Sequence, residues 1–481
     1  MACTTLLVGK KASFDGSTLV ARTEDSGAGA FNPKKFIIVT PDKQPRKYKS
    51  VISGVEIDLP DNPMRYSAMP NATNHEGIWA CAGVNDKNIA MTATETITTN
   101  ERVLAADPLV IGGIGEEDIV TLVLPYINSP REGVERLGYL LEKYGTYEMN
   151  GIGFHDENEI WWLETIGGHH WIAKKVPDNC YVVMPNQLGI DSFDLEDAKS
   201  EKINHMASAD LEDFIKNNYL DLSLHGKLNP RDAFGSHSDS DHTYNTPRAW
   251  IIQRYFNPNS NVWDGDKADY KTFSDDIPWA RTPEKKITIE DVKYVLSHHY
   301  QGTPYDPYSN HADPLLKGSY RPIGINRNNV LVLTQIRPYM PENIKAVEWI
   351  AYGSTTFNGI VPFYPRVNVT PQYLANTTNQ VSTDNFYWAN RLIAALADYK
   401  YNENIAFIDR YKQQVQASTK ALLNKYDREI SANIDVDDSS TLEEANLAIA
   451  NLTRSLTDDL LSVVLNQTSL LMKNSFSRSD G

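Results

Sequence analysis

Short apolar stretches separated by polar turns run through the first half of the chain. Residues 4–8 and 18–21 are two such stretches on either side of a turn at Phe14, Asp15 and Gly16, and this pattern predicts a β-hairpin. Further stretches bounded by Gly, Pro and Asp predict strands at 88–94, 159–164, 170–174 and 181–184. A second strand region is expected in NVLVLTQIRP and VEWIAYGS, in the second half of the chain.

Helical spacing of apolar residues occurs in two places. Residues 116–144 open with acidic side chains and stop before Gly145, as helices do, but Pro125 and Pro130 divide them into two helices. From about Asn402, apolar residues recur at helical spacing on both sides of the acidic stretch IDVDDSS. We therefore expect a domain at 1–400 followed by a helical hairpin at 401–481, packed on the core or on a neighbouring subunit. Residues 226–322 are polar and are expected to form long loops.

The order of these elements predicts the fold class. Runs of strands interrupted by pairs of helices favour an α+β sandwich over a doubly wound parallel sheet. The glycine-rich patterns of dinucleotide sites and of phosphate-binding loops do not occur in the sequence. We therefore predict no nucleotide site.

The composition of the chain excludes several classes of protein. The 481 residues are 41% apolar and carry a formal charge of −16 without a basic stripe, so nucleic acid is not an expected partner. No apolar run reaches the roughly 18 residues of a membrane span, and the N-terminus predicts no secretory signal. Three cysteines in so long a chain argue against a disulfide framework. We expect a soluble, cytoplasmic protein.

The first 25 residues contain the strongest candidate chemistry. Cys3 opens the first predicted strand, and the hairpin returns Arg22 and Asp25 toward it. A cysteine attacks as thiolate, which a nearby cation favours and a base can generate. If Cys3 became the first residue, its own amine, with a reference pKa of about 7.7–8.0, could act as that base. Taken alone, however, a cysteine at position 3 is usually a small buried apolar residue.

Several ordered motifs accompany the cysteine. Cys-Thr-Thr at 3–5, Asp-Gly-Ser at 15–17 and Ala-Arg-Thr-x-Asp at 21–25 resemble the opening of the bacterial dipeptidase A family. That family belongs to the N-terminal-nucleophile hydrolases and is related to secernins, penicillin V acylases and bile salt hydrolases. The resemblance continues through 83–96, 159–179, 182–187, 246–250 and 347–365. It implies a four-layer αββα sandwich with a C-terminal helical extension.

The resemblance also implies roles for individual residues. Cys3 is similar to the family nucleophile, Arg22 and Asp25 to its supporting pair, and Asn186 to the side chain that stabilises the oxyanion. Arg248, in TPRAW, resembles the arginine that closes the acylase site.

Thr94 and Glu95 stand near the position where the acylases have a second oxyanion residue. An ionised Glu95 side chain could not stabilise an oxyanion, although its backbone N–H could. The carboxylate would suit the free ammonium group of a dipeptide, and the alternative is a strand-end glutamate that faces water. We therefore expect Thr94 and Glu95 to contact the substrate.

The implied function is a homo-oligomeric, autoprocessed cysteine dipeptidase that hydrolyses dipeptides with free N-termini through a Cys3 thioester, with neither metal nor organic cofactor. Met1 and Ala2 must first be removed, by self-cleavage at the Ala2–Cys3 bond or by a second trimming step. The alternatives are an amidase of the penicillin V or bile-salt type, a secernin-like non-catalytic protein and a metallopeptidase.

Other polar motifs have simpler interpretations. The segment HSDSDH at 237–242 resembles a metal-ligand cluster, but it lacks EF-hand spacing and an HExxH helix, which favours a polar surface loop. It could alternatively border the active site, because TPRAW follows it. The pairs His169-His170 and His298-His299 would point to opposite faces if they lay on strands, so neither pair could then chelate one metal. Cys81 and Cys180 are expected to be core residues.

Overall fold

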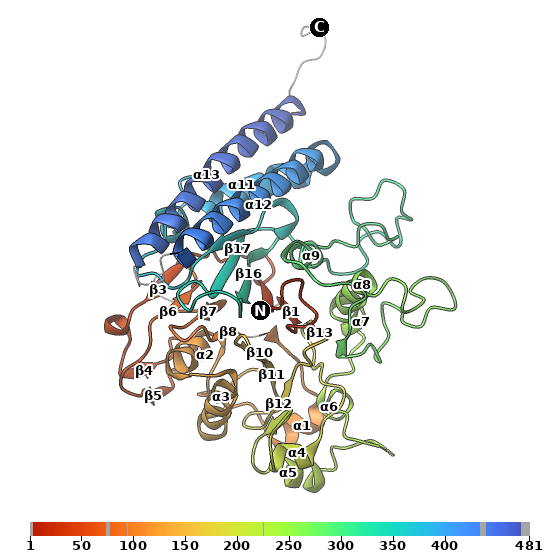
Figure 1. Ribbon diagram of the computed structural model, residues 1–481. Coiled ribbons are helices and arrows are strands. Elements are labelled where there is room, and N and C mark those ends of the chain that lie inside the picture. Colours follow the sequence, from red (N-terminus) through yellow and green to blue (C-terminus); the bar gives the residue numbers. More distant parts are fainter. Residues whose placement is uncertain (1–2, 74–76, 94, 225, 433–438, 473–481) are drawn as a thin grey trace.

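The computed structural model describes residues 3–73, 77–93, 95–224, 226–432 and 439–472 (Figure 1). It is a mixed α/β structure with two large antiparallel sheets and a helical C-terminal region. Among the residues described, no helix combines the length and the apolar character needed to cross a bilayer.

The first sheet contains the N-terminal hairpin at its centre. Its strand order is β15-β13-β1-β2-β16-β17-β18. In this sheet Cys3 lies opposite Glu24 and Thr5 lies opposite Arg22. The strands are β1 Cys3–Val8, β2 Thr18–Asp25, β13 Tyr181–Met184, β15 Ala280–Arg281, β16 Asn328–Ile336, β17 Ala346–Tyr352 and β18 Val361–Phe363.

The second sheet has the order β14-β12-β11-β10-β8-β7, and a short strand, β9, also pairs with β10. Its strands are β7 Ala82–Val84, β8 Ala90–Thr92, β9 Glu95–Thr96, β10 Asn150–His155, β11 Ile160–Thr165, β12 Trp171–Lys175 and β14 His205–Ala207. Two small sheets pair β3 Ile37–Val39 with β6 Tyr66–Ala68 and β4 Lys47–Lys49 with β5 Glu56–Asp58.

The two large sheets face each other. A methyl group placed on Gly153 of β10 would lie 3.4 Å from Leu7 and 3.5 Å from Val20 of the first sheet. His155, also on β10, hydrogen-bonds through its two ring nitrogens to Thr18 and Thr334. Burial lowers the pKa of His155 to about 3, so this imidazole joins the sheets as a neutral group.

Helices cover the outer faces of the sheets. Side chains of α2 and α3 pack on the outer face of the second sheet, and those of α8, α9 and α12 pack on the first. The helices are α1 Glu101–Ala106, α2 Glu116–Val123, η2 Leu124–Tyr126, α3 Pro130–Tyr144, α4 Leu195–Lys199, α5 Leu211–Asn217, α6 Pro230–Phe234, α7 Asp241–Tyr244, α8 Thr246–Phe256, α9 Ile289–Val295, α10 Gln372–Ala375, α11 Phe386–Tyr399, α12 Tyr401–Ala432 and α13 Ser439–Leu470, with 3-10 turns at η1 Pro41–Lys43 and η3 Thr355–Phe357.

Several local predictions are confirmed. The N-terminal hairpin forms, and β13 has the predicted bounds. The helical segment 116–144 breaks where its prolines predict, because Ser129 caps α3 through a 3.1 Å bond from the amide of Glu132. Gly145 ends α3 with φ 70°, a conformation that favours glycine.

Other predictions are wrong in extent. Residues 226–322 are not only loops, because α6, α7, α8 and α9 lie within them. The strand predicted at 88–94 is limited to Ala90–Thr92, and α11 was not predicted. The helices α6, α7 and α9 and the strand at Ala90–Thr92 are short, so their periodicity gives little signal. The 14 residues of α11 do have apolar side chains at helical spacing after the capping residue Asn385, and this signal was missed.

Near the C-terminus, α12 and α13 lie beside α11 above β16 and β17 (Figure 1). Tyr411 and Val415 of α12 and Ile449 of α13 share one apolar cluster with Ile350 of β17. Most of the predicted acidic link, residues 434–438 of 434–440, lies outside the described residues. The division of the chain at residue 400 stays a prediction.

Candidate active site

The thiol of Cys3 is held against a guanidinium group. Residues alternate faces along β1, so Cys3 and Thr5 share one face, and Thr5 lies opposite Arg22. Nη2 of Arg22 lies 3.0 Å from Sγ of Cys3, and both residues are fully buried. The hairpin thus brings the first two predicted site residues into direct contact.

Arg22 is fixed by a set of buried partners. Its Nη2 donates to Oε1 of Glu116 over 2.6 Å, and its Nη1 donates to Oε2 of Glu24 over 3.0 Å. Nη1 also lies 3.2 Å from both the carbonyl oxygen and Sγ of Cys81. Glu24 forms a second ion pair with Lys34. The guanidinium beside Cys3 is therefore matched by two carboxylates.

Burial controls the charge state of the thiol. It raises the pKa of Cys3 well above the usual value, Arg22 opposes this rise, and Glu95 and Glu116 add to it. Burial lowers the pKa of Arg22, but Cys3, Cys81 and Glu116 outweigh that effect and raise it. Before Met1 and Ala2 are removed, the nitrogen of Cys3 is part of a peptide bond. In that form the thiol is protonated at neutral pH.

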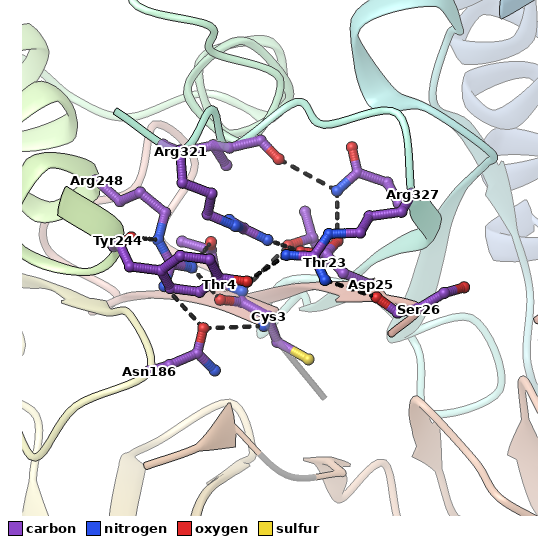
Figure 2. A network of polar contacts seen from close by, with 12 residues as sticks. Cys3, Thr4, Thr23, Asp25, Ser26, Asn186, Tyr244, Arg248, Arg321 and Arg327 are labelled. Atoms are coloured by element: carbon purple, nitrogen blue, oxygen red, sulfur yellow. Dashed lines mark hydrogen bonds and ion pairs between the residues drawn. The ribbon is translucent and has the colours of Figure 1, made fainter. Parts of the chain in front are cut away.

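The backbone of Cys3 is clamped from the side opposite its sulfur (Figure 2). Its N–H donates to Oδ1 of Asn186 over 3.3 Å. Arg248, on α8, donates through Nη1 to the carbonyl oxygen of Cys3 and, over 2.7 Å, to the hydroxyl of Thr4. Nη2 of Arg248 lies 2.7 Å from the same Asn186 oxygen. Asn186 and Arg248 are thus brought together around the peptide of Cys3.

The amide nitrogen of Asn186 joins Glu95 to this network. Nδ2 donates to Oε1 of Glu95 over 2.9 Å and to the carbonyl of Thr96 over 2.8 Å. Oε2 of Glu95 accepts from the hydroxyl of Thr5 over 2.8 Å. Glu95 is fully buried, so the alternative of a glutamate facing water is wrong. Burial raises the pKa of Glu95 to about 8, against the effects of Arg248 and Arg22. Thr94 lies outside the described residues.

Asp25 ends β2, one residue beyond Glu24, the strand partner of Cys3. Its carboxylate accepts from Nη2 of Arg321 and from Nδ2 of Asn328. The supporting role that the resemblance implies for Asp25 stays a prediction, since the amine of Cys3 forms only after Ala2 is removed.

A cavity opens beside this network. It has a volume of about 630 Å³, and its lining includes Asn186, Thr96, Thr98, Asp241 and Tyr244. The cavity is large enough for a small peptide. Part of the HSDSDH segment therefore borders the candidate site, as one of the two interpretations of the sequence expected.

The acidic and histidine side chains of the HSDSDH segment do not converge on one point. His242 pairs with Asp275, and Asp241 accepts from Ser236 and Asn245. Among the described residues, no three His, Cys, Asp or Glu side chains converge in a way that could hold a metal ion.

Neither of the two histidine pairs lies on a strand. His169 and His170 precede β12 in a turn, and both Nδ1 atoms lie within 2.9 Å of the carboxylate of Asp107. His298 and His299 also lie outside the strands, where Nδ1 of His299 contacts Asp306 over 2.9 Å. Cys81 is buried, whereas Cys180 is only partly buried.

Four residues near the site were not identified from the sequence: Glu116, Tyr244, Arg321 and Arg327. Glu116 lies among other acidic residues that open a helix, which is an ordinary helix start. Arg321 and Arg327 belong to a polar stretch without periodicity. The proximity of Tyr244 to TPRAW was the available signal for that residue.

The chain is similar to known peptidases. The family described as peptidase family C69 matches residues 2–414. A protein named dipeptidase from Bifidobacterium longum (strain NCC 2705) is 53% identical over 532 residues, covering 100% of both chains. A probable dipeptidase A from Streptococcus pyogenes serotype M3 (strain SSI-1) is 55% identical over 481 residues, again covering 100% of both. Dipeptidase A from Lactobacillus helveticus is 43% identical over 98% of this chain and 97% of its own.

Proposed function

Because this chain belongs to peptidase family C69 and is therefore a peptide hydrolase, we propose that it is a dipeptidase with Cys3 as its nucleophile. Its substrates would be dipeptides with free N-termini, in keeping with the names of relatives that align over its full length. The observation that carries the proposal is the 3.0 Å contact between Sγ of Cys3 and the buried guanidinium of Arg22. A cation at that distance favours the thiolate, which is the reactive form of cysteine.

Removal of Met1 and Ala2 would supply the missing base. The amine freed on Cys3 would lie where the peptide nitrogen now lies, 3.3 Å from Oδ1 of Asn186. Its reference pKa of about 7.7–8.0 suits a general base near neutral pH. Asp25, at the end of the neighbouring strand, is the carboxylate that we expect to stabilise the resulting ammonium.

The reaction would proceed through a thioester. The Cys3 amine takes the thiol proton, and Sγ attacks the carbonyl carbon of the scissile peptide bond. The C–N bond then breaks, and the proton passes from the Cys3 ammonium to the leaving amine, which departs as the C-terminal amino acid. Water, deprotonated by the same amine, attacks the thioester. The C–S bond breaks, the N-terminal amino acid leaves as the acid, and the proton returns to the thiolate.

The oxyanion would be stabilised by Nδ2 of Asn186 and by a backbone N–H. Both protons of Nδ2 are engaged in this structure, one with Glu95 and one with Thr96. Asn186 must therefore exchange one of these bonds for the oxyanion when substrate binds. A donor of this kind typically contributes about 2.7–4 kcal/mol to transition-state stabilisation.

Glu95 is proposed to bind the substrate ammonium group. Its pKa of about 8 means that much of it is protonated at neutral pH before substrate binds. An arriving ammonium would favour the ionised form, because an opposite charge at close range lowers the pKa of a carboxyl group. Thr94 is proposed to contribute to the same subsite.

The proposal also covers the fold class, the C-terminal helices and the assembly of the protein. With α2 and α3 outside one sheet and α8, α9 and α12 outside the other, we assign the core to the four-layer αββα class of N-terminal-nucleophile hydrolases. Residues 401–481 would form a separate helical unit on this core. We also propose a cytoplasmic homo-oligomer that frees Cys3 by autoprocessing.

The test is the intact mass of the purified protein, followed by limited thiol alkylation. We expect a mass that begins at Cys3. Alkylation of Cys180→Ala, which lacks the most accessible thiol, should modify Cys3 and abolish dipeptide hydrolysis. Cys3→Ala should retain the fold, judged by circular dichroism, and show no hydrolysis. Cys180→Ala is the matched control, because Cys180 is the more accessible thiol and its Sγ hydrogen-bonds only with Asn179 and Thr282 among the described residues. A mass that retains Ala2, with full activity after alkylation, would overturn the proposal.

A further inference from the structure

Arg321 is buried with hydrogen-bonding capacity to spare. Its side chain belongs to a residue that is 7% exposed, and its backbone N–H donates to the carbonyl of Thr243. Nη2 pairs with Asp25, but Nε and Nη1 have no hydrogen-bond partner among the described residues. A buried donor without a partner carries a desolvation cost that a ligand can remove. Three N–H bonds of this guanidinium are thus available, two on Nη1 and one on Nε.

Arg321 belongs to a cluster of cations with a deficit of negative charge (Figure 2). The guanidinium groups of Arg248, Arg321 and Arg327 lie 5.3, 5.1 and 5.9 Å from the ring centroid of Tyr244. Asp25 is the one carboxylate among the described residues that forms an ion pair with any of the three. Burial and the like charge of Arg327 lower the pKa of Arg321, although Cys3 opposes this effect. The cluster is suited to an anion.

The cluster also lies beside the proposed nucleophile. Asp25, which contacts Arg321, immediately follows the strand partner of Cys3. Tyr244, over which Arg321 lies, lines the same cavity as Asn186. The carboxylate of a bound dipeptide follows its scissile carbonyl by a single residue, a span of about 3.3–3.6 Å. The anion that belongs closest to the reacting carbonyl of such a substrate is therefore its own C-terminus.

We propose that Arg321, with Arg327 beside it, binds the C-terminal carboxylate of the substrate and so restricts hydrolysis to dipeptides. This inference rests on the proposed dipeptidase function and names the group that sets substrate length. A tripeptide has a neutral amide at the position where a dipeptide has its carboxylate. It would leave the free N–H groups of Arg321 without a charged acceptor, and the third residue would need space within the cluster.

The experiment compares alanyl-alanine with its C-terminal amide as substrates of the processed enzyme. We expect kcat/KM for the free acid to exceed that for the amide by roughly 10- to 100-fold, the range that a charged hydrogen bond provides. Arg321→Gln should lower kcat/KM for the acid by a similar factor beyond any loss that it causes on the amide, so that the ratio of the two values falls toward one. Arg321→Lys should recover part of the preference.

Arg391→Gln is the matched control. Arg391 is also buried with an unpaired Nε among the described residues, but both of its Nη groups donate, to the carbonyls of Asn326 and Asn328. Its loss should affect the acid and the amide equally. Equal rates of the wild type on both substrates, or an equal loss on both in Arg321→Gln, would overturn the carboxylate proposal and leave the dipeptidase function intact. A processed wild type that cleaves neither substrate would overturn both. The comparison within the wild type needs no variant, so it holds even if Arg321→Gln does not fold.

Discussion

Two buried arginines near Cys3, Arg22 and Arg321, have different surroundings. Arg22 faces the sulfur, and both of its Nη groups are bonded, with Glu24 and Glu116 as charge partners. Only its Nε lacks a partner among the described residues. Arg321 pairs with Asp25 through Nη2, and its Nε and Nη1 have no hydrogen-bond partner among the residues that the structure describes.

This difference suggests different roles: Arg22 is a structural cation, and Arg321 is a cation that can still bind an anion. A guanidinium with its charge already balanced can hold a thiolate in place but has little capacity for another anion. A guanidinium with a single counter-ion and free donors remains costly until a ligand arrives. We therefore expect changes at Arg22 to act mainly on folding and on the nucleophile, and changes at Arg321 to act mainly on substrate discrimination.

The largest effect is expected for Arg22→Gln. Removing one partner from a buried ion pair leaves uncompensated charge, which typically costs about 3–5 kcal/mol, and here both Glu24 and Glu116 lose a partner. Urea unfolding should show this loss in the free energy of unfolding. Arg321→Gln should cost less, because only Asp25 loses a cation and Asn328 continues to donate to it. Similar losses in the two variants would remove the distinction between the arginines.

A smaller effect on the free energy of unfolding is expected for Glu95→Gln, and it should be visible in how that free energy depends on pH. Lys34 and Arg22 overcome burial and lower the pKa of Glu24, whereas burial raises that of Glu95 to about 8. Between the usual pKa near 4.5 and this value, the native state holds a proton that the unfolded state has released. The wild type should therefore lose stability as pH rises from 5 to 8.

Glutamine does not titrate, so Glu95→Gln should lose less stability over the same pH interval. The difference in the free energy of unfolding between variant and wild type should change by a few kcal/mol at most, because one pKa unit corresponds to about 1.36 kcal/mol. Urea titrations at both pH values measure it. Parallel pH profiles for the two proteins would mean that Glu95 is ionised throughout, as a carboxylate with a dedicated cation would be.

The contrast between the arginines also marks what the sequence could predict. The hairpin that brings Arg22 to Cys3 depends on a local turn and on alternation within two strands, both of which are visible in the residues. The contact between Asp25 and Arg321 joins residues 296 positions apart. No periodicity in the polar stretch around Arg321 indicates which carboxylate it will reach, because that depends on how β16 aligns beside β2.

The motif resemblance supplied part of this long-range information. It identified Asn186 and Arg248, which the structure places on one hydrogen-bond network with Cys3. It did not predict that Glu95 is fully buried, since the strand containing it is only two residues long. Nor did it predict that both protons of the Asn186 amide are already engaged. Such details depend on side-chain packing between strands that are distant in sequence.

The smallest effect is expected for Cys81→Ser, which tests whether Arg22 depends on its carboxylates alone. Sγ of Cys81 lies 3.2 Å from Nη1 of Arg22, but the carbonyl oxygen of the same residue lies equally close and is unchanged by the substitution. A serine hydroxyl can still accept from Nη1, so we expect the free energy of unfolding to fall by about 1 kcal/mol or less, within the usual worth of one hydrogen bond. Dipeptide hydrolysis should change less than about fivefold, which corresponds to about 1 kcal/mol. Urea unfolding and kcat/KM on one dipeptide measure both. A loss approaching that of Arg22→Gln would show that the second sulfur helps to fix the guanidinium, and the position of Arg22 would then depend on three side chains rather than two.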